Sequence, residues 1–148
     1  METLVVSTLI QRPVEEVFAF LTDARNNAKW QAAGGLQRIQ QMPESPVGVG
    51  TRILETRSFM GRTFETTSEV TEFEPNRTYT RSAIDPSSII RQGVMTFAPV
   101  DGATQVTFQM QVKAGGLFAI AEPLLVATMK KDFDSGLSQL KALLERAA

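Results

Sequence analysis

The sequence contains no cysteine and no histidine among its 148 residues. Their absence excludes disulfide bonds, thiolate nucleophiles, zinc sites built from these residues and a serine–histidine–aspartate triad. Any catalysis would have to use a carboxylate, tyrosine, lysine, arginine or water. We therefore predict no metal and no cofactor, and we assign no catalytic residue.

The sequence also has no excess of basic residues, because its formal net charge is -1. Without a positive field, we do not expect the protein to bind nucleic acid. Arg52, Arg57 and Arg62 are evenly spaced along the chain. In an extended strand this odd spacing places successive side chains on opposite faces of a sheet, so no basic stripe is predicted.

Long apolar runs are missing as well. The segment from Leu117 to Met129 is apolar but short, and Glu122 and Pro123 interrupt it, so it should not span a bilayer. The first residues alternate between polar and apolar and lack the basic start of a signal peptide. We expect a cytoplasmic protein with no membrane span.

The composition is that of an ordinary globular domain, with 43% hydrophobic and 21% charged residues. A chain of this length can bury roughly 70% of its unfolded surface, which is enough for a proper core. We therefore expect residues 1–148 to form a single domain.

The dominant pattern is an amphipathic helix predicted from Leu117 to Ala148. Its apolar stripe follows helical spacing and consists of Leu125, Met129, Phe133, Leu137, Leu140 and Leu144. Such a helix needs a layer to pack on, and the preceding chain is rich in strand patterns. Gly136 interrupts the helix at a cost of about 1 kcal/mol relative to alanine, which predicts close approach by a strand or space for a ligand.

The N-terminal third predicts a strand and two short helices. Glu2 to Ile10 is rich in β-formers. Pro13 suits the first position of a helix, and Thr22 or Asp23 can cap a second short helix that ends near Trp30.

From Leu36 onward the chain predicts about six strands, most of them joined as antiparallel hairpins. Turn signals separate them at Pro43 to Gly50, Met60-Gly61, Pro75-Asn76, Asp85-Pro86 and Asp101-Gly102. Seven strands at about 4.8 Å each make a sheet much wider than one helix, which is about 10 to 12 Å across. We expect the sheet to curl around the helix and leave a cavity between them.

Several segments carry a family resemblance: Arg12 to Phe18 with Leu21, Asp23 and Trp30; Val49-Gly50-Thr51; Phe73-Glu74-Pro75; Phe97-Ala98-Pro99; and Gly136-Leu137 to Leu140-Lys141. With them the whole chain resembles the START-like, or SRPBCC, helix-grip superfamily, and within it the polyketide cyclase/dehydratase-like branch. The resemblance implies an α+β helix-grip fold, with a curved antiparallel sheet of about seven strands around one long C-terminal helix. Members of this superfamily bind lipids, hormones, polyketides or quinones, assist other proteins, or do chemistry.

Hairpin parity predicts which residues face the cavity. An even loop at Met60-Gly61 places Arg57 opposite Phe64 and Glu55 opposite Thr66. The inward face then carries Ile53, Glu55, Arg57, Phe59, Phe64, Thr66, Ser68 and Val70. An even turn at Pro75-Asn76 adds Tyr79, Arg81 and Ala83 to this face.

The strand after Asp85-Pro86 can be placed in two ways. An even loop puts Ile90, Gln92 and Val94 inside, whereas pairing back from the strand after Asp101-Gly102 demands Arg91, Met95 and Phe97. One loop must be odd, or the strand must carry a bulge. We favour the second set, because the strand from Ala103 alternates more strongly.

The predicted ligand-binding residues are Trp30, Glu55, Arg57, Phe59, Phe64, Tyr79, Arg81, Arg91, Met95, Phe108, Met110, Leu125, Met129 and Phe133. Trp30 can equally serve as a core anchor for the short helices. Buried charges need partners. Glu55 and Arg57 can pair with each other, which leaves Arg81 to seek a carboxylate or phosphate. Alternatively, both arginines point outward and pair with surface glutamates such as Glu65 or Glu69.

The leading hypothesis for function is binding of a small hydrophobic or amphipathic molecule, such as a lipid or polyketide, in the cavity. An alternative is a cyclase or dehydratase in which arginine or tyrosine polarises a carbonyl and Glu55, with a raised pKa, moves a proton. A third is a protein-interaction module, which a filled core and an exposed apolar patch would favour. Formation of a homodimer is left open.

Overall fold

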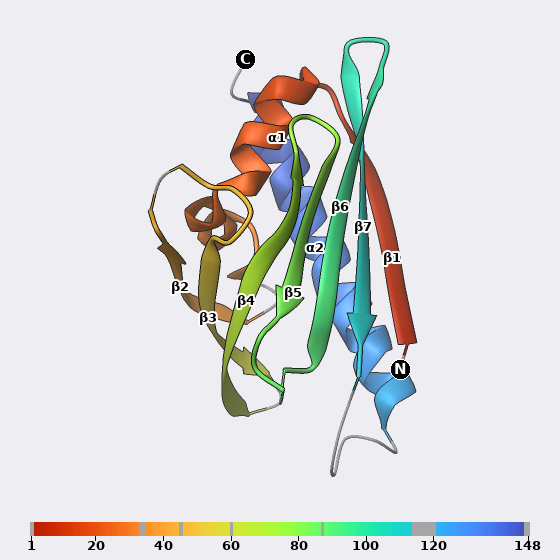
Figure 1. Ribbon diagram of the computed structural model, residues 1–148. Coiled ribbons are helices and arrows are strands. Elements are labelled where there is room, and N and C mark those ends of the chain that lie inside the picture. The colour runs from red at the N-terminus through yellow and green to blue at the C-terminus, as the bar shows by residue number, and fades with distance from the viewer. Residues whose placement is uncertain are drawn as a thin grey trace.

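A seven-stranded sheet and one long helix dominate the computed structural model, which describes residues 2–32, 35–44, 46–59, 61–86, 88–113 and 121–146 (Figure 1). The elements in chain order are β1 (Glu2–Ile10), α1 (Val14–Thr22), the 3-10 helix η1 (Ala24–Lys29), β2 (Leu36–Met42), β3 (Arg52–Phe59), β4 (Arg62–Glu74), β5 (Thr78–Ala83), β6 (Ile90–Val100), β7 (Ala103–Val112) and α2 (Glu122–Arg146). The predicted α+β helix-grip fold is confirmed.

The strands lie in the order β1-β7-β6-β5-β4-β3-β2, and every neighbouring pair is antiparallel. The first strand of the chain therefore pairs with the last, and α2 crosses behind the sheet toward α1 (Figure 1). None of the helices in the described ranges is long and apolar enough to cross a membrane.

The β6–β7 hairpin shows how local sequence sets strand register. Val100 pairs with Ala103, so the loop consists of Asp101 and Gly102 alone. Both residues have positive φ, 50° and 82°. Two-residue hairpin turns with positive φ match the right-handed twist of the strands, and Asp-Gly is a preferred pair for them. The predicted turn at this position is confirmed.

The helix boundaries match the predictions closely, with one correction. Pro13 is the residue before α1 and not its first helical residue, because its ψ of 149° is extended. Asp23 caps η1, and its carboxylate accepts a hydrogen bond of 3.1 Å from the backbone N–H of Arg25. Helix α2 begins at Glu122. The predicted start at residues 117–120 and the predicted end at residues 147–148 lie outside the described residues.

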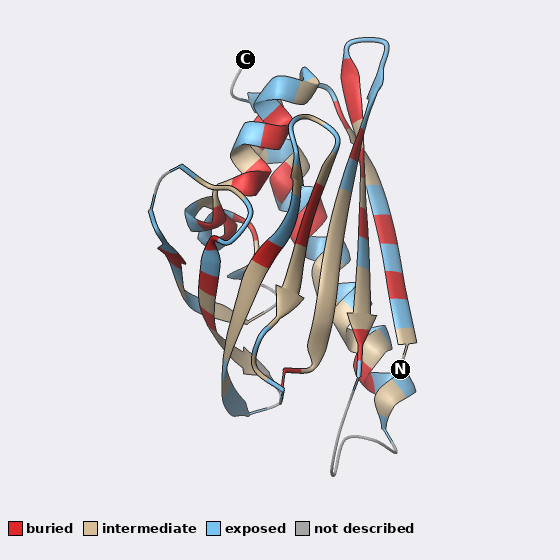
Figure 2. Cartoon of the chain, viewed as in Figure 1, coloured by how far each residue is buried: buried red, intermediate tan, exposed pale blue. Residues whose placement is uncertain are grey.

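The apolar stripe of α2 packs differently along its length. Its C-terminal half contributes Leu137, Leu140 and Leu144 to the main core, together with Val17 and Phe18 of α1 and residues of the sheet. Figure 2 shows buried positions that alternate with exposed ones along β1 and that follow one side of the helices. The core thus fills the end of the molecule near α1.

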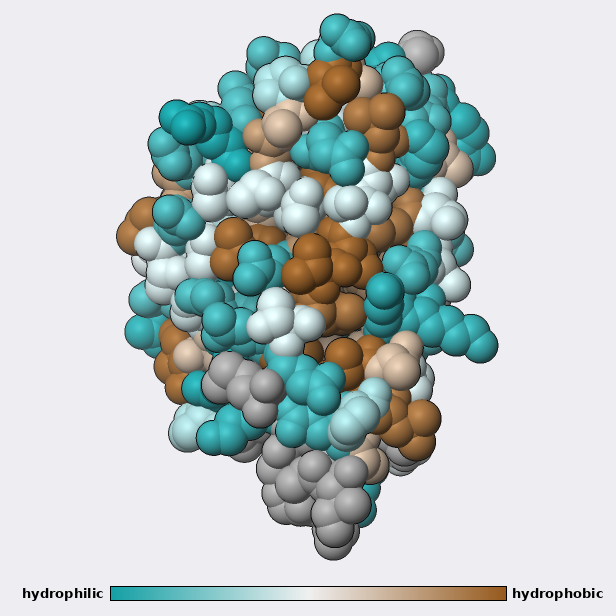
Figure 3. All heavy atoms as spheres, turned by 90° about the vertical axis from the view of Figure 1, so that its right-hand side faces the viewer, coloured by the Kyte–Doolittle hydropathy of each residue, from teal (hydrophilic) through white to brown (hydrophobic). Residues whose placement is uncertain are grey.

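Viewed from the β1 edge, apolar atoms gather in the middle of the molecule between hydrophilic margins (Figure 3). Val5 on β1 is 52% exposed, and Leu124 on α2 is 66% exposed. Val5 belongs to the outer face of β1, because its neighbours Leu4 and Val6 are buried.

Gly136 allows close contact between α2 and the residue that ends η1. A Cβ atom at this position would lie 2.8 Å from the carbonyl oxygen of Trp30 and 3.4 Å from Cε3 of its indole ring. The sequence predicted approach by a strand or room for a ligand here. The close neighbour is Trp30, which follows η1, and not a strand. Gly136 also lines the cavity, which agrees with the second alternative.

We expect Gly136→Ala to destabilise the fold by about 1 to 3 kcal/mol, because the new methyl group would overlap a backbone oxygen that cannot move independently. Glycine-to-alanine exchange inside a helix ordinarily has the opposite sign. Urea denaturation measures the difference. The matched control is Ser135→Ala at the exposed neighbouring position, where we expect a change within about 0.5 kcal/mol. Equal stability of the two variants would contradict the contact.

Candidate functional site

A cavity of about 230 Å³ lies between the inner face of the sheet, η1 and the N-terminal half of α2. This volume is just below the roughly 300 Å³ at which typical ligand pockets begin. The described residues that line it are Asn27, Trp30, Gln31, Glu55, Arg57, Phe64, Glu65, Thr66, Ser68, Tyr79, Arg81, Ala83, Ser88, Ile89, Ile90, Gln92, Gly93, Val94, Met95, Phe108, Met110, Leu125, Met129, Asp132, Phe133 and Gly136. Twelve of the fourteen residues predicted from the sequence are among them.

The two remaining predictions have different outcomes. The side chain of Phe59 lies outside the described part of the structure. Arg91 is not among the residues that line the cavity. It lies at a bulge in β6, between the pairs of Ile90 and Gln92 with β7, and its guanidinium donates to the carbonyl oxygens of Asp85 and Ser88. The predicted inward position of Arg91 is wrong, because the bulge reverses the alternation at that residue.

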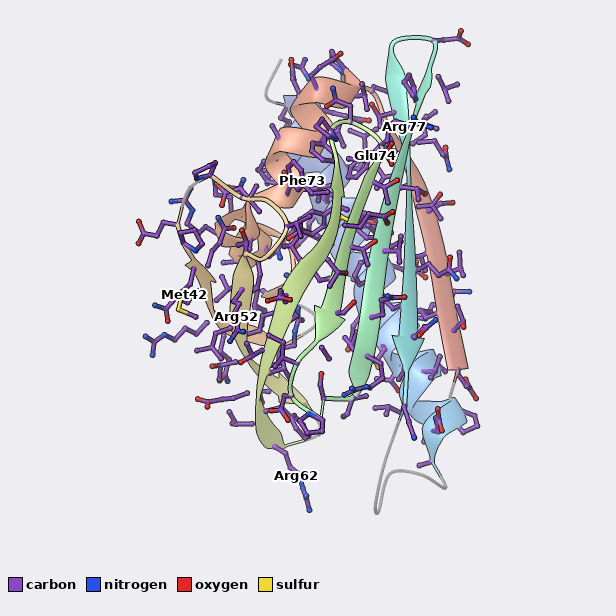
Figure 4. The ribbon with its side chains drawn as sticks, in the orientation of Figure 1. Met42, Arg52, Arg62, Phe73, Glu74 and Arg77 are labelled. Carbon is purple, nitrogen blue, oxygen red and sulfur yellow. The ribbon has the colours of Figure 1, made fainter. Side chains whose placement is uncertain are left out.

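The β3–β4 hairpin has the predicted register. Arg57 pairs with Phe64, and Glu55 pairs with Thr66. Arg57 consequently faces the cavity, whereas Arg52 and Arg62 extend away from the sheet (Figure 4). Arg52 forms an exposed ion pair of 3.6 Å with Glu69. The predicted alternation is confirmed for Arg52 and Arg57 but is wrong for Arg62, which pairs with Phe59 across the hairpin and therefore shares the face of Arg57.

Tyr79 and Arg81 face the cavity for a reason that the sequence did not reveal. The predicted two-residue turn is wrong, because Glu74 pairs with Thr78 and leaves three residues in the loop. A bulge at Thr71, where the register shifts between Val70 and Glu72, then restores the predicted alternation, so Val70 pairs with Arg81. The odd loop and the bulge each shift the alternation by one residue, so together they leave Tyr79 and Arg81 on the predicted inward face.

Strand β6 follows the favoured alternative at Met95 and Phe97 only, because Ile90, Gln92 and Val94, the set that we did not favour, also line the cavity. Tyr79 pairs with Met95, and Arg81 pairs with Gly93, so the loop between β5 and β6 is odd. Phe97 pairs with Val106 and belongs to the core. Gly93 is an inward position without a side chain, and it leaves space inside the cavity.

A buried ion cluster forms the polar part of the cavity wall. Oε2 of Glu55 accepts a hydrogen bond of 2.6 Å from Nη2 of Arg57, and Oε1 accepts one from Nη2 of Arg81. Arg57 also donates to Oε1 of Gln31, which links the cluster to the end of η1. The expectation that Arg81 would lack an anion is wrong, because Glu55 bridges both arginines. Both point inward, which excludes the predicted surface pairs with Glu65 or Glu69.

The arginines determine the charge state of Glu55. Burial by itself would raise the pKa of its carboxyl group, but the guanidinium groups of Arg81 and Arg57 outweigh burial and lower the pKa to about 2. Burial raises the pKa of Tyr79, against the opposing effect of Arg81, so the phenol is protonated at neutral pH. The cluster therefore contains two cations, one anion and a neutral hydroxyl.

Three buried polar atoms on the cavity wall lack a hydrogen-bond partner among the described residues: Oδ1 of Asn27, Nε1 of Trp30 and Oγ of Ser68. Each such group ordinarily costs about 1 to 3 kcal/mol. An occupant that pairs with any of them would recover part of this free energy. Unpaired polar atoms of this kind are typical of sites that favour function over stability.

Aromatic side chains form the apolar part of the wall. Trp30 is 1% exposed, and its ring contacts those of Phe108 and Phe133 at centroid distances of 5.9 Å and 5.6 Å. Phe108 and Phe133 contact each other at 5.0 Å. These rings come from three separate segments and hold one another in edge-on or tilted contacts. Both predicted roles of Trp30, core anchor and cavity wall, apply.

Sequence reasoning did not select several lining residues, including Asn27, Gln31, Ser68 and Gly93. Ser68 lay on the predicted inward face, so strand alternation could have identified it. Asn27 and Gln31 are four residues apart in the sequence, and residues at this spacing share one face of a helix. This spacing could have identified them as a pair on the side of Trp30. Gly93 gave none, because a glycine in a strand does not indicate which face it would occupy.

Comparison with known protein families assigns the chain to a family. A family model described as "Polyketide cyclase / dehydrase and lipid transport" matches residues 1–145. The chain belongs to this family. No curated protein matches it, so the family assignment comes from the family model.

Solved structures show the same helix-grip fold as this family member. They include TTHA0849 from Thermus thermophilus, with 16% identity, coverage of 99% of both chains and a TM-score of 0.79. MLL2253 from Mesorhizobium loti has 20% identity, 99% coverage of both chains and a TM-score of 0.72. The Aha1 dimer from Colwellia psychrerythraea has 19% identity, covers 98% of this chain and 97% of its own, and has a TM-score of 0.66.

Proposed function

We propose that this polyketide cyclase/dehydrase and lipid transport family member binds a small hydrophobic or amphipathic molecule in its cavity. The observation that carries the proposal is the combination of an aromatic and aliphatic wall with a paired ion cluster inside one cavity of about 230 Å³. Ligand sites combine a mainly apolar lining with a few placed polar groups. The family description, which includes lipid transport, supports the same class of ligand.

The alternative of proton-transfer catalysis by Glu55 receives less support. A general acid or base works best when its pKa lies near the operating pH. The pKa of Glu55 is lowered to about 2, so its carboxylate is a weak base and stays deprotonated at neutral pH. The raised carboxyl pKa that the cyclase or dehydratase hypothesis required is not present at this residue.

The cavity also favours small-molecule binding over a protein-interaction module. A module of that kind would use a filled core and an exposed apolar patch. Here the N-terminal half of α2 directs Leu125, Met129 and Phe133 to the cavity instead. The similar protein from Colwellia psychrerythraea is a dimer, and a homodimer of this chain is a prediction that the experiment below also tests.

The proposed function is tested by native mass spectrometry of the protein purified from its own host. We expect a mass increment that disappears on denaturation, and analysis of the released molecule should identify an apolar or amphipathic compound. The same spectrum gives the oligomeric state. An empty protein whose melting temperature is unchanged by fatty acids, aromatic polyketides and quinones would exclude the binding function.

A further inference from the structure

We propose that the cavity selects an uncharged ligand that brings a hydrogen-bond acceptor, such as a ketone or an alcohol, and that Glu55 excludes ligand carboxylates by acting as an internal counter-ion. This inference rests on the proposed binding function. It replaces the acidic ligand that the sequence suggested, because Arg81 has a partner within the protein.

Glu55 occupies the anion position between the two arginines of the cavity wall. Its carboxylate, only 5% exposed, lies between Arg57 and Arg81, where a ligand carboxylate would have to bind. A second anion that used the remaining N–H groups of these arginines would lie close to the Glu55 carboxylate. Two carboxylates at one site repel each other, so binding of the second one is disfavoured. The protein thus supplies the anion that an acidic ligand would otherwise bring.

The charged side chains of the cavity wall include acidic as well as basic residues. Besides Glu55 and the two arginines, the charged residues that line the cavity in the described ranges are Glu65 and Asp132. Three acids and two arginines give a formal charge of -1 for this lining. Glu65 is exposed, so solvent screens its charge, and the other charged lining residues are formally neutral together, with Glu55 and Asp132 against Arg57 and Arg81. The wall therefore offers no surplus positive charge to a ligand carboxylate.

The polar groups beside Glu55, two guanidinium groups and a tyrosine hydroxyl, are hydrogen-bond donors. Each guanidinium carries five N–H donors and no acceptor, and the Tyr79 hydroxyl is protonated. The side chains of Arg57 and Arg81 line the cavity and are 25% and 19% exposed, so both keep accessible surface beside the apolar wall. A carbonyl or hydroxyl oxygen is complementary to these donors and adds no charge.

The test compares four probes of equal chain length: methyl hexyl ketone, octanol, octanoate and octane. The chain has a single tryptophan, Trp30, which lies in the cavity wall, so its intrinsic fluorescence reports binding without a label. We expect the ketone and the alcohol to bind the wild-type protein about tenfold or more tightly than octanoate at neutral pH. Octane should bind more weakly than the ketone, because it lacks the acceptor.

The decisive variant is Glu55→Gln, which keeps the shape of the side chain but removes its charge. We expect octanoate to gain about tenfold or more in affinity and to become the preferred probe, while ketone affinity changes by less than about threefold. Because this variant can be poorly stable, its melting temperature is also measured with each probe, and octanoate should raise it most. Glu69→Gln, which removes a surface partner of Arg52, should keep the wild-type order.

The outcomes separate this inference from the proposed function. If octanoate binds the wild-type protein as tightly as the ketone, or if Glu55→Gln keeps the wild-type preference, the role of Glu55 is wrong while the binding function stands. If none of the four probes, and none of the larger panel above, changes the fluorescence or the melting temperature, the binding function fails with it.

Discussion

Replacing Glu55 with glutamine is expected to destabilise the ligand-free protein by about 3 kcal/mol, because the change leaves two partly buried guanidinium groups without their shared anion. For a protein of this size, about 3 kcal/mol corresponds to a fall of roughly 10 °C in melting temperature. Differential scanning calorimetry measures the change. Glu69→Gln is the matched control, and it should shift the melting temperature very little, since its ion pair with Arg52 is exposed.

Two further measurements decide whether charge is the cause. A triple variant, Glu55→Leu with Arg57→Met and Arg81→Met, removes every charge of the cluster and should recover most of the lost stability. In the wild-type protein, the ionised Glu55 stabilises the folded state above its ordinary pKa of 4.5, and this contribution is lost as the pH falls toward the folded pKa of about 2. Glu55→Gln should lack that part of the acid transition. A triple variant as unstable as the single one would show that packing matters more than charge.

Gly93→Val is expected to abolish ligand binding without loss of stability. Gly93 lies on the inward face of β6, between Arg81 on β5 and Met110 on β7. An added Cβ atom would have Met110 Cγ as its nearest neighbour, at 3.9 Å, so the new side chain would extend into the cavity without a clash at its first atom. Valine also favours strands and restricts the unfolded chain, so we expect the melting temperature to stay the same or rise.

Binding of methyl hexyl ketone, followed by Trp30 fluorescence, measures the effect of this substitution. The control is Gly48→Ala, because a Cβ atom there meets nothing within 4 Å and Gly48 does not line the cavity. It should bind the ketone like the wild-type protein. Full ketone binding by Gly93→Val would place the ligand elsewhere, and a large fall in melting temperature would show that the cavity is narrower at β6 than the structure indicates.

The fold and much of the cavity wall follow from short-range features of the sequence. Strand alternation and tight turns at Met60-Gly61 and Asp101-Gly102 fix which side chains share a face, because the period along a strand is two residues. The apolar stripe of α2 fixes the side that it presents to the sheet. These patterns were enough to place Glu55, Arg57 and the aromatic residues of the wall inside.

The sequence could not reveal the bulges at Thr71 and Arg91. A bulge adds one residue to a strand and needs no special residue type. It therefore changes which side chains face inward without leaving a recognisable pattern in the sequence. At Thr71 it compensated for a misjudged turn and preserved the prediction for Arg81. At Arg91 nothing compensated, and an arginine predicted for the cavity bonds to the preceding loop instead.

The sequence by itself determined the α+β helix-grip fold, the inward face of β3 and the apolar side of α2, because the patterns that predict them lie in residues close together in the chain. Only the tertiary structure decided that Glu55 joins Arg57 to Arg81 across the intervening strand β4, and that α2 packs a core with one half and borders a cavity with the other. The physical reason is that pairing of buried charges and division of space between core and cavity depend on distances between segments far apart in the chain. Those distances are set when the sheet curls around the helix.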